Sequence, residues 1–145
     1  MPVSYEEYSK YLNILLKDFI DILKDNLKDN LISVILYNIP KKDATHLQSD
    51  IDLLVICKNL PNSKWERYDT IMKLLAILEP KVEELHKKIG IYLYLSPVLK
   101  SQKEAQQINK LYFDLVKNGK ILFDRNNFFK QIIKMVENLS KKLPF

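Results

Sequence analysis

The chain has 145 residues, a formal net charge of +5, 47% hydrophobic residues and 28% charged residues, a balance typical of one soluble globular domain. Its longest apolar runs, such as Leu31 to Tyr37, are too short to cross a bilayer, and its N-terminus lacks the basic and apolar regions of a signal peptide. These properties argue against a membrane protein, and we expect a cytoplasmic location.

Hydrophobic periodicity predicts the first three elements. A capping box that begins at Ser4 opens a helix that we expect to run to about Lys28. The apolar, β-branched run Leu31–Tyr37 predicts a strand, and a second strand is expected over Asp50–Cys57. The segment between these strands is polar and contains Pro40, so it is predicted to be a loop.

The second half of the chain is predicted to alternate helices with strands. Five further elements are expected: a helix over 64–78 with a second stretch to about Lys88, a strand over Ile91–Leu95, a helix from the capping box at Ser101 to about Lys117, a strand over Lys120–Phe123, and a helix over Asn126–Lys142. Pro80 is expected to end or kink the helix over 64–78. Gly90 is expected to stop the second stretch, which runs to about Lys88. Ser96 and Pro97 are expected to close the third strand.

This order of elements predicts an α/β (α+β) fold with a single mixed β-sheet of about four strands and helices packed against it. No internal repeat or linker divides the sequence, so residues 1–145 are expected to form a single domain. The lone Cys57 cannot form an internal disulfide, and at the end of an apolar strand it is interpreted as a core residue.

The most informative segment is the start of the second strand, Ser49–Val55. Asp50 and Asp52 stand two residues apart, and side chains at that separation in a strand point to the same face. At about 6–7 Å and an effective dielectric near 20, two carboxylates repel each other by roughly 2–3 kcal/mol. A divalent cation offsets that cost most directly.

This segment and the strand before it carry a resemblance to a known family. Ser49–Val55 matches the form Ser-Asp-Ile-Asp-Leu-Leu-Val residue for residue, and it resembles the nucleotidyltransferase superfamily, the DNA polymerase beta-like fold, especially its minimal, MNT-type members. In that family a strand ends in Leu-Phe-Gly-Ser, and after ten intervening residues Asp-x-Asp opens the next strand. Leu36 and Tyr37 match Leu-Phe, while Asn38 stands at the Gly position and Ile39 at the Ser position.

The resemblance covers roughly residues 31–125 and includes two departures from the family pattern. The Gly-Ser pair is gone, although Asn38 tolerates the left-handed backbone that Gly provides. The family places a third carboxylate on the next strand, and Ile91–Leu95 carries no acid. Tyr92 and Tyr94 share one face there and can cover the site instead.

The resemblance implies a nucleotidyltransferase-like fold and a site at the paired aspartates. Asp50 and Asp52 are implied to be the catalytic carboxylates and to hold Mg²⁺ or Mn²⁺. The residues implied to contact an NTP, with ATP expected, are Asn38, Lys41, Lys42 and Ser49. The implied reaction transfers a nucleoside monophosphate to a hydroxyl acceptor. A helical HEPN-type partner, as in toxin–antitoxin pairs, or self-association is also implied.

Several alternatives remain open. The chain is alternatively a catalytically degenerate member that binds a nucleotide or a partner without transfer. Asp50 and Asp52 alternatively serve only as turn residues at a strand entrance, and Lys41 with Lys42 only as a solvated pair. Asp43 is considered as a substitute for the third acid. Nucleic acid is not expected as a partner, because lysines alternate with acids and no arginine-rich stripe occurs.

Overall fold

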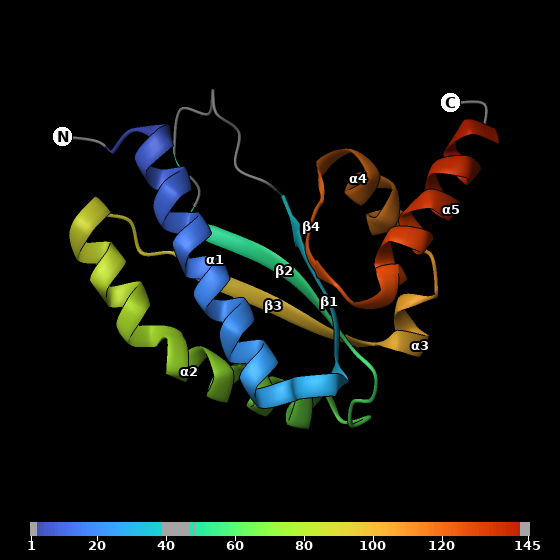
Figure 1. Cartoon of the computed structure of the whole chain (residues 1–145), viewed down its shortest axis with the longest axis horizontal. Coiled ribbons are helices and arrows are strands. Elements are labelled where there is room, and N and C mark those ends of the chain that lie inside the picture. The colour runs from blue at the N-terminus through green and yellow to red at the C-terminus, as the bar shows by residue number, and fades with distance from the viewer. Residues whose placement is uncertain (1–2, 39–46, 48, 143–145) are drawn as a thin grey trace. The chain divides into compact units, whose positions relative to one another are not determined.

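The computed structural model describes residues 3–38, 47 and 49–142. They fall into two compact units, the first formed by residues 3–28, 47, 49–51 and 61–96 and the second by residues 29–38, 52–60 and 97–142. The main elements in chain order are α1 (Tyr5–Leu27), β1 (Leu31–Tyr37), β2 (Asp50–Cys57), α2 (Lys64–Ile89), β3 (Tyr94–Ser101), α3 (Gln102–Ala105), α4 (Lys110–Asn118), β4 (Lys120–Asp124) and α5 (Phe128–Lys142) (Figure 1).

The four strands form one mixed sheet in the order β3-β2-β1-β4, which confirms the predicted fold class. β1 is antiparallel to both of its neighbours. Its register places Tyr37 opposite Asp52 on β2 and Ser33 opposite Asp124 on β4. The first six residues of β1 are buried, as expected for a strand in the interior of a sheet.

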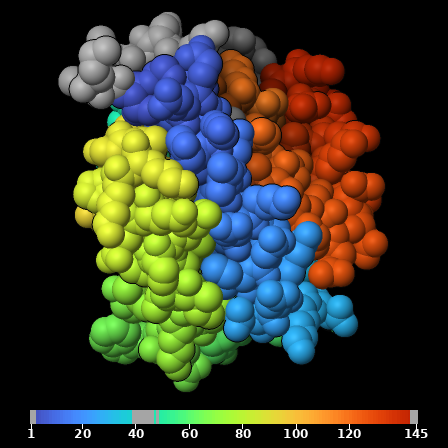
Figure 2. Space-filling model, turned by 60° about the vertical axis from the view of Figure 1, so that its left-hand side comes forward, coloured from blue at the N-terminus to red at the C-terminus, as the bar shows by residue number. Residues whose placement is uncertain are grey.

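The first unit is built on the packing of α1 against α2. Ser4 caps α1 as predicted, since its hydroxyl accepts a hydrogen bond from the Glu7 N–H at 3.1 Å. The two helices lie side by side (Figures 1 and 2). Their buried residues recur at helical spacing and form the apolar stripes Tyr8, Leu12, Leu15, Leu16, Phe19 and Leu23 on α1 and Ile71, Leu74, Leu78, Val82, Leu85 and Ile89 on α2.

The second unit has its own core between the sheet and the C-terminal helices. Its buried members are Ile32, Ile35, Leu54, Ile56, Ala105, Tyr112, Leu115, Phe129, Ile132 and Val136. The Tyr112 ring packs edge-on against Phe129, and its hydroxyl donates to the Ala105 carbonyl at 2.6 Å. This bond satisfies a polar group that burial would otherwise leave without a partner. Cys57 is also buried, as predicted.

Asp124 joins the sheet of the second unit to its last helix. Its carboxylate accepts three hydrogen bonds: one from the Ser33 hydroxyl at 2.6 Å, and one each from the Phe129 and Lys130 N–H groups at 2.9 Å. The two backbone donors belong to the first turn of α5, where N–H groups have no partner within the helix. The helix begins two residues later than predicted, because Arg125–Asn127 forms a separate 3-10 turn.

Pro80 does not end the helix in which it lies, so of the two effects expected of it, an end or a kink, the end is wrong. α2 continues unbroken from Lys64 to Ile89. Proline removes one helical hydrogen bond, but the buried stripe continues on both sides of it through Leu78 and Val82. Packing against α1 therefore outweighs the local penalty. Gly90 ends the helix as predicted, in the left-handed region at φ 74°.

The predicted third strand is wrong in its bounds. β3 spans Tyr94–Ser101, so Pro97 lies inside the strand and does not close it. The Tyr94 N–H points inward to the Ser49 carbonyl, and successive N–H groups in a strand alternate in direction. The nitrogen of Pro97, three residues on, therefore faces the free edge of β3. At an edge strand that position needs no donor, so proline is tolerated there.

The helix predicted from Ser101 to about Lys117 is two helices. The capping box at Ser101 is present, with both of its hydrogen bonds to Glu104, but α3 ends at Ala105. Asn109 then caps α4 by accepting from the Leu111 N–H at 3.0 Å. A second capping residue inside a polar stretch is the sequence signal for this break. None of the helices in the described part of the chain has the length and apolar character that crossing a bilayer requires.

Candidate functional site

The paired aspartates open β2 as predicted. Asp50 is exposed, Asp52 is half-buried, and Ile51 between them is 1% exposed. Strand alternation therefore places both carboxylates on the face opposite to Ile51. Asp52 shares its face with Leu54 and Ile56, which enter the core of the second unit. The carboxylates thus mark the point where a buried strand reaches solvent.

Asn38 fixes the position of Asp52. It follows the last residue of β1 and has a left-handed backbone, with φ 54°, which asparagine tolerates. Its side-chain Nδ2 donates a hydrogen bond to Asp52 Oδ2 at 2.8 Å. The sequence analysis missed this bond. The antiparallel register that sets Tyr37 opposite Asp52 could have indicated it, because that register brings the next residue beside the same carboxylate.

Tyr37 lies opposite Asp52 in the β1–β2 strand pair, and its pKa depends on the charge of Asp52. Burial raises the pKa of the Tyr37 phenol above its ordinary value, and the negative charge of Asp52 raises it further. Both effects disfavour the tyrosinate, so the phenol stays neutral at physiological pH. Asp52 therefore has a neutral neighbour on β1 and an amide donor beyond it.

Tyr94 stands on the other side of β2, next to Asp50. Its backbone N–H donates to the Ser49 carbonyl at 2.8 Å. The helix α2 connects β2 to β3 as a crossover, which joins parallel strands. In a parallel ladder, a residue whose N–H binds the carbonyl of one residue lies opposite the next residue. Tyr94 therefore faces Asp50 across the pair, and both side chains are exposed.

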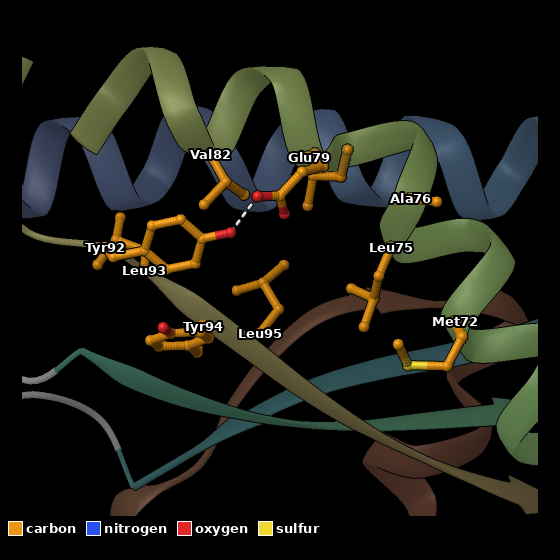
Figure 3. A pocket seen from close by; sticks show the side chains of 10 residues that line it. Met72, Leu75, Ala76, Glu79, Val82, Tyr92, Leu93, Tyr94 and Leu95 are labelled. Carbon is orange, nitrogen blue, oxygen red and sulfur yellow. Dashed lines mark hydrogen bonds between the residues drawn. The ribbon is translucent and has the colours of Figure 1, made fainter. Parts of the chain in front are cut away.

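The ring of Tyr92 packs against the ring of Tyr94. The centres of their rings are 4.5 Å apart, and the Tyr92 hydroxyl donates to the Glu79 carboxylate on α2 (Figure 3). That hydrogen bond, followed by burial, raises the pKa of Tyr92 to about 12. His86 on α2 is exposed and packs edge-on against the Tyr92 ring.

A hollow of about 450 Å³ lies between α2 and β3 in the first unit, beside these tyrosines (Figure 3). Its volume is within the range of small-molecule sites. The residues that line it are largely apolar: Met72, Leu75, Ala76, Leu78, Glu79, Val82, Tyr92, Leu93, Tyr94 and Leu95. Its polar pair, Tyr92 and Glu79, is joined by the hydrogen bond described above.

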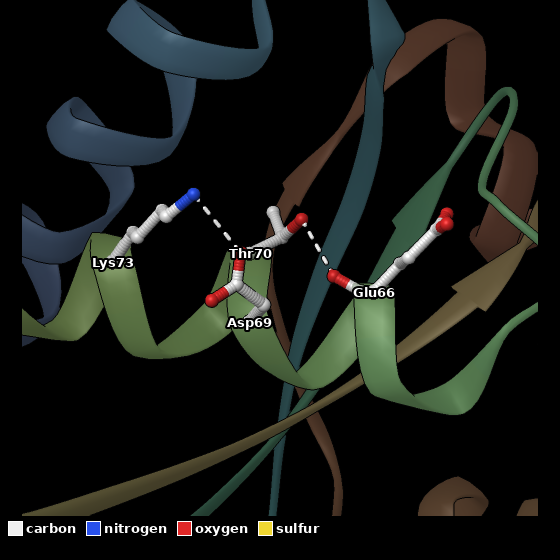
Figure 4. Close-up of polar contacts among 4 residues, drawn as sticks. All are labelled: Glu66, Asp69, Thr70 and Lys73. Atoms are coloured by element: carbon white, nitrogen blue, oxygen red, sulfur yellow. Dashed lines mark hydrogen bonds and ion pairs between the residues drawn. The ribbon is translucent and has the colours of Figure 1, made fainter.

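A second hollow, over the first turns of α2, is not a candidate site. Its lining residues are Pro61, Trp65, Glu66, Asp69 and Thr70. Figure 4 shows that the polar groups near it bond within the helix. The Thr70 hydroxyl donates to the Glu66 carbonyl at 3.0 Å, and Lys73 pairs with Asp69 at 2.9 Å. These are ordinary contacts of an exposed helix surface.

The donor set at β2 fits a magnesium-type cation. Mg²⁺ takes oxygen ligands and is commonly held by one or two carboxylates together with substrate phosphates. Asp50 and Asp52 supply two carboxylates on one face. The described residues contain no cluster of three or more His, Cys, Asp or Glu side chains that could hold a metal by themselves. The predicted contacts Lys41 and Lys42, together with Asp43, lie outside the described residues.

Comparison with known proteins identifies a relative in sequence. No profile of a protein family matches the chain. A protein of Methanocaldococcus jannaschii, named for a proposed protein adenylyltransferase activity, is 32% identical over 136 residues. The alignment covers 92% of this chain and 86% of that protein. Identity at this level over nearly the whole of both chains shows common family membership.

Solved structures share the fold at low sequence identity. A chain of the MntA–HepT toxin–antitoxin crystal structure matches with a TM-score of 0.53 and 16% identity, covering 90% of this chain and 87% of that one. A spectinomycin adenyltransferase from Enterococcus faecialis, crystallised with ATP and spectinomycin, matches with a TM-score of 0.52 and 16% identity. That match covers 88% of this chain and 59% of the adenyltransferase.

Proposed function

Because this chain belongs to the nucleotidyltransferase superfamily, as one of its minimal, MNT-type members, we propose that it transfers a nucleoside monophosphate from an NTP to a hydroxyl acceptor. ATP is the proposed donor, since the M. jannaschii relative is named for protein adenylyltransferase activity. Asp50 and Asp52 are the proposed metal-binding and catalytic carboxylates. Asn38 and Ser49 are the proposed contacts to the nucleotide, together with Lys41 and Lys42.

The observation that carries this proposal is the arrangement of the carboxylates at the start of β2. Both stand on the face away from Ile51, and Asp52 is held by the Asn38 amide at 2.8 Å. Two acids on one face at the exposed end of a buried strand carry an electrostatic cost that a cation relieves. The bond from Asn38 fixes Asp52 before any ligand arrives, which lowers the entropy cost of binding.

The proposed transfer replaces one phosphorus–oxygen bond with another. The acceptor oxygen attacks the α-phosphorus, the bond from that phosphorus to the oxygen bridging the α- and β-phosphates breaks, and pyrophosphate leaves. The acceptor gives its hydroxyl proton to a carboxylate or to water. Bound Mg²⁺ supplies positive charge that neutralises the triphosphate and favours the deprotonated acceptor. Asp50 and Asp52 would hold that ion.

We also propose a protein partner of the HEPN type. The MntA–HepT structure is a toxin–antitoxin complex, and one of its chains shares this fold. The chain has exposed apolar side chains on its helices that suit such contact, including Trp65 and Tyr68 on α2 and Met135 and Leu139 on α5. Self-association through the same kind of surface is the competing arrangement, and the mass of the purified protein in solution distinguishes the two.

A catalytically degenerate protein is the second candidate. The resemblance places a third carboxylate on the strand after α2, and the residue that faces Asp50 there is Tyr94. If two carboxylates are too few to activate the acceptor, the chain binds nucleotide and a partner without transfer. The observation that favours this candidate is therefore that Tyr94, and not an acid, lies opposite Asp50.

Calorimetric titration of ATP with Mn²⁺ into the full chain tests the binding proposal. We expect heat of binding for the native protein and its loss in Asp50→Asn and Asp52→Asn. Asp69→Asn is a matched control, because this aspartate is exposed on α2 and pairs only locally with Lys73. Equal, flat traces for native protein and variants would overturn the proposal. Incubation with labelled ATP and a candidate partner then separates the enzyme from the degenerate protein.

A further inference from the structure

Tyr94 is 55% exposed and lies beside Asp50, one of the two proposed catalytic carboxylates. We propose that Tyr94 is itself an acceptor, so that the chain transfers a nucleoside monophosphate from the bound NTP to its own Tyr94 oxygen. This inference rests on the proposed function. It adds a modification site and a chemical class of acceptor, a phenol, to that function.

The backbone geometry places Tyr94 directly across from Asp50. The N–H of Tyr94 binds the Ser49 carbonyl at 2.8 Å, and adjacent strands lie about 4.8 Å apart. The residues on either side of Tyr94 in the chain, Leu93 and Leu95, are 1% and 8% exposed, whereas Tyr94 is open to solvent. Asp50 has the same outward position on β2, before the buried Ile51. The phenol and the carboxylate therefore project from one face of neighbouring strands.

Tyr92 contacts the ring of Tyr94, and the two tyrosines differ in that the Tyr92 hydroxyl is bonded to Glu79 whereas Tyr94 is 55% exposed. The two ring centres are 4.5 Å apart. Tyr92 is anchored in turn, because its hydroxyl donates to the Glu79 carboxylate (Figure 3). That bond raises the pKa of Tyr92 to about 12 and commits its hydroxyl to Glu79. Tyr92 thus acts as a positioning residue, and Tyr94 is the acceptor.

The step balances without a further reactant. The Tyr94 oxygen attacks the α-phosphorus of the NTP, the bond to the bridging oxygen breaks, and pyrophosphate leaves with its electron pair. The phenolic proton passes to Asp50 or to water. The product is a phosphodiester that joins the tyrosine to the nucleoside monophosphate, and the donor NTP is the one already proposed.

The test is to incubate the full chain with ATP and Mn²⁺, and to measure its intact mass and the modified peptide. We expect the mass of one AMP unit to be added, with fragmentation spectra assigning it to Tyr94. Tyr94→Phe removes the addition, and Asp50→Asn also removes it. Tyr68→Phe is the matched control, since Tyr68 is 56% exposed on α2, and it retains the addition. A rate independent of protein concentration shows transfer within one chain.

The outcomes separate this inference from the proposed function. Heat of ATP binding that depends on Asp50, without AMP on Tyr94, overturns the inference and leaves the function standing. AMP on a different residue of the chain also overturns the inference while confirming transfer. If the native protein shows neither ATP binding nor AMP addition, both the inference and the proposed function are overturned. Peptide mapping of the native chain gives these answers even if Tyr94→Phe does not fold.

Discussion

Two aspartates on strands that flank β1 are held in contrasting ways. Asp124, opposite Ser33, accepts three hydrogen bonds from the sheet and from the start of α5. Asp52, opposite Tyr37, accepts one side-chain bond from Asn38 within the described residues. The first carboxylate is saturated by donors from the protein, whereas the second retains acceptor capacity at the exposed end of its strand. The number of donors around each carboxylate therefore distinguishes the structural role of Asp124 from the ligand-binding role proposed for Asp52.

Replacing Asp124 gives the largest expected effect on stability. Asp124→Ala removes the cap of α5 and leaves the buried Ser33 hydroxyl without its partner. We expect the free energy of unfolding to fall by about 3 kcal/mol, from both losses together. Chemical denaturation measures it. In Ser33→Ala/Asp124→Ala the loss is smaller than the sum of the single effects, and strict additivity would contradict a shared role.

Replacing Asp52 separates binding from stability. Asp52→Asn keeps the shape of the side chain but removes its charge, so we expect affinity for ATP with Mn²⁺ to fall by about 30-fold, or about 2 kcal/mol. Because the variant removes repulsion between two carboxylates, its unfolding free energy stays level or rises. Calorimetry and denaturation on the same sample check both. If Asp52→Asn binds ATP normally but has a lower unfolding free energy, Asp52 has a structural role like that of Asp124 and the proposed contrast is wrong.

Asn38 links the backbone turn to the carboxylate, and two variants divide these roles. Asn38→Gly keeps the left-handed backbone but loses the donor to Asp52. Asn38→Ala loses the donor and also strains a residue at φ 54°. We expect Ala to lower the unfolding free energy by about 1 kcal/mol and Gly to lower it less. Both variants weaken nucleotide binding equally if the amide alone matters, and calorimetry measures this.

The titration of Tyr37 gives the smallest expected effect. Its folded pKa is raised by burial and then by the charge of Asp52. Above about pH 10 the unfolded chain loses this proton first, so the stabilising contribution is present below that pH and is lost as pH rises through the folded pKa. In Asp52→Asn we expect the Tyr37 pKa to fall toward its burial-only value, as followed by NMR.

Tyr112 is the internal control for that titration. Burial alone raises its pKa, so Asp52→Asn leaves it unchanged. A shift of Tyr112 together with Tyr37 would indicate a general change in the fold and not a local loss of charge. Addition of Mn²⁺ is avoided in this titration, because the ion is paramagnetic. Mg²⁺ bound at Asp52 should lower the Tyr37 pKa in the same direction as the substitution.

Local patterns predicted most of the fold. Continuous apolar runs located β1 and β2, and capping residues located the starts of α1 and α3. Pro80 and Pro97 misled the prediction, because sequence alone shows neither the α1 contact that sustains α2 nor the edge position of β3. Whether a helix or strand tolerates a proline depends on the hydrogen bond that the proline removes and on the packing around it. Both are known only from the tertiary structure. The single-domain organisation stays a prediction.

The candidate site was only partly accessible from the sequence. The spacing of Asp50 and Asp52 shows that they share a strand face, and the position of Asn38 indicated its left-handed backbone. The Asn38 bond to Asp52 and the placement of Tyr94 opposite Asp50 depend on strand register. Register is set by pairing between distant segments, so it cannot be deduced from one strand. The metal and nucleotide contacts stay predictions.

Pro97 also affects how this protein meets other chains. Its nitrogen faces outward from the end strand of the sheet and has no hydrogen to offer. An incoming strand would therefore find an interrupted row of donors along β3, which discourages edge-to-edge aggregation. Binding of a partner strand to the edge of β3 is therefore disfavoured, and association at this edge depends on side-chain contacts.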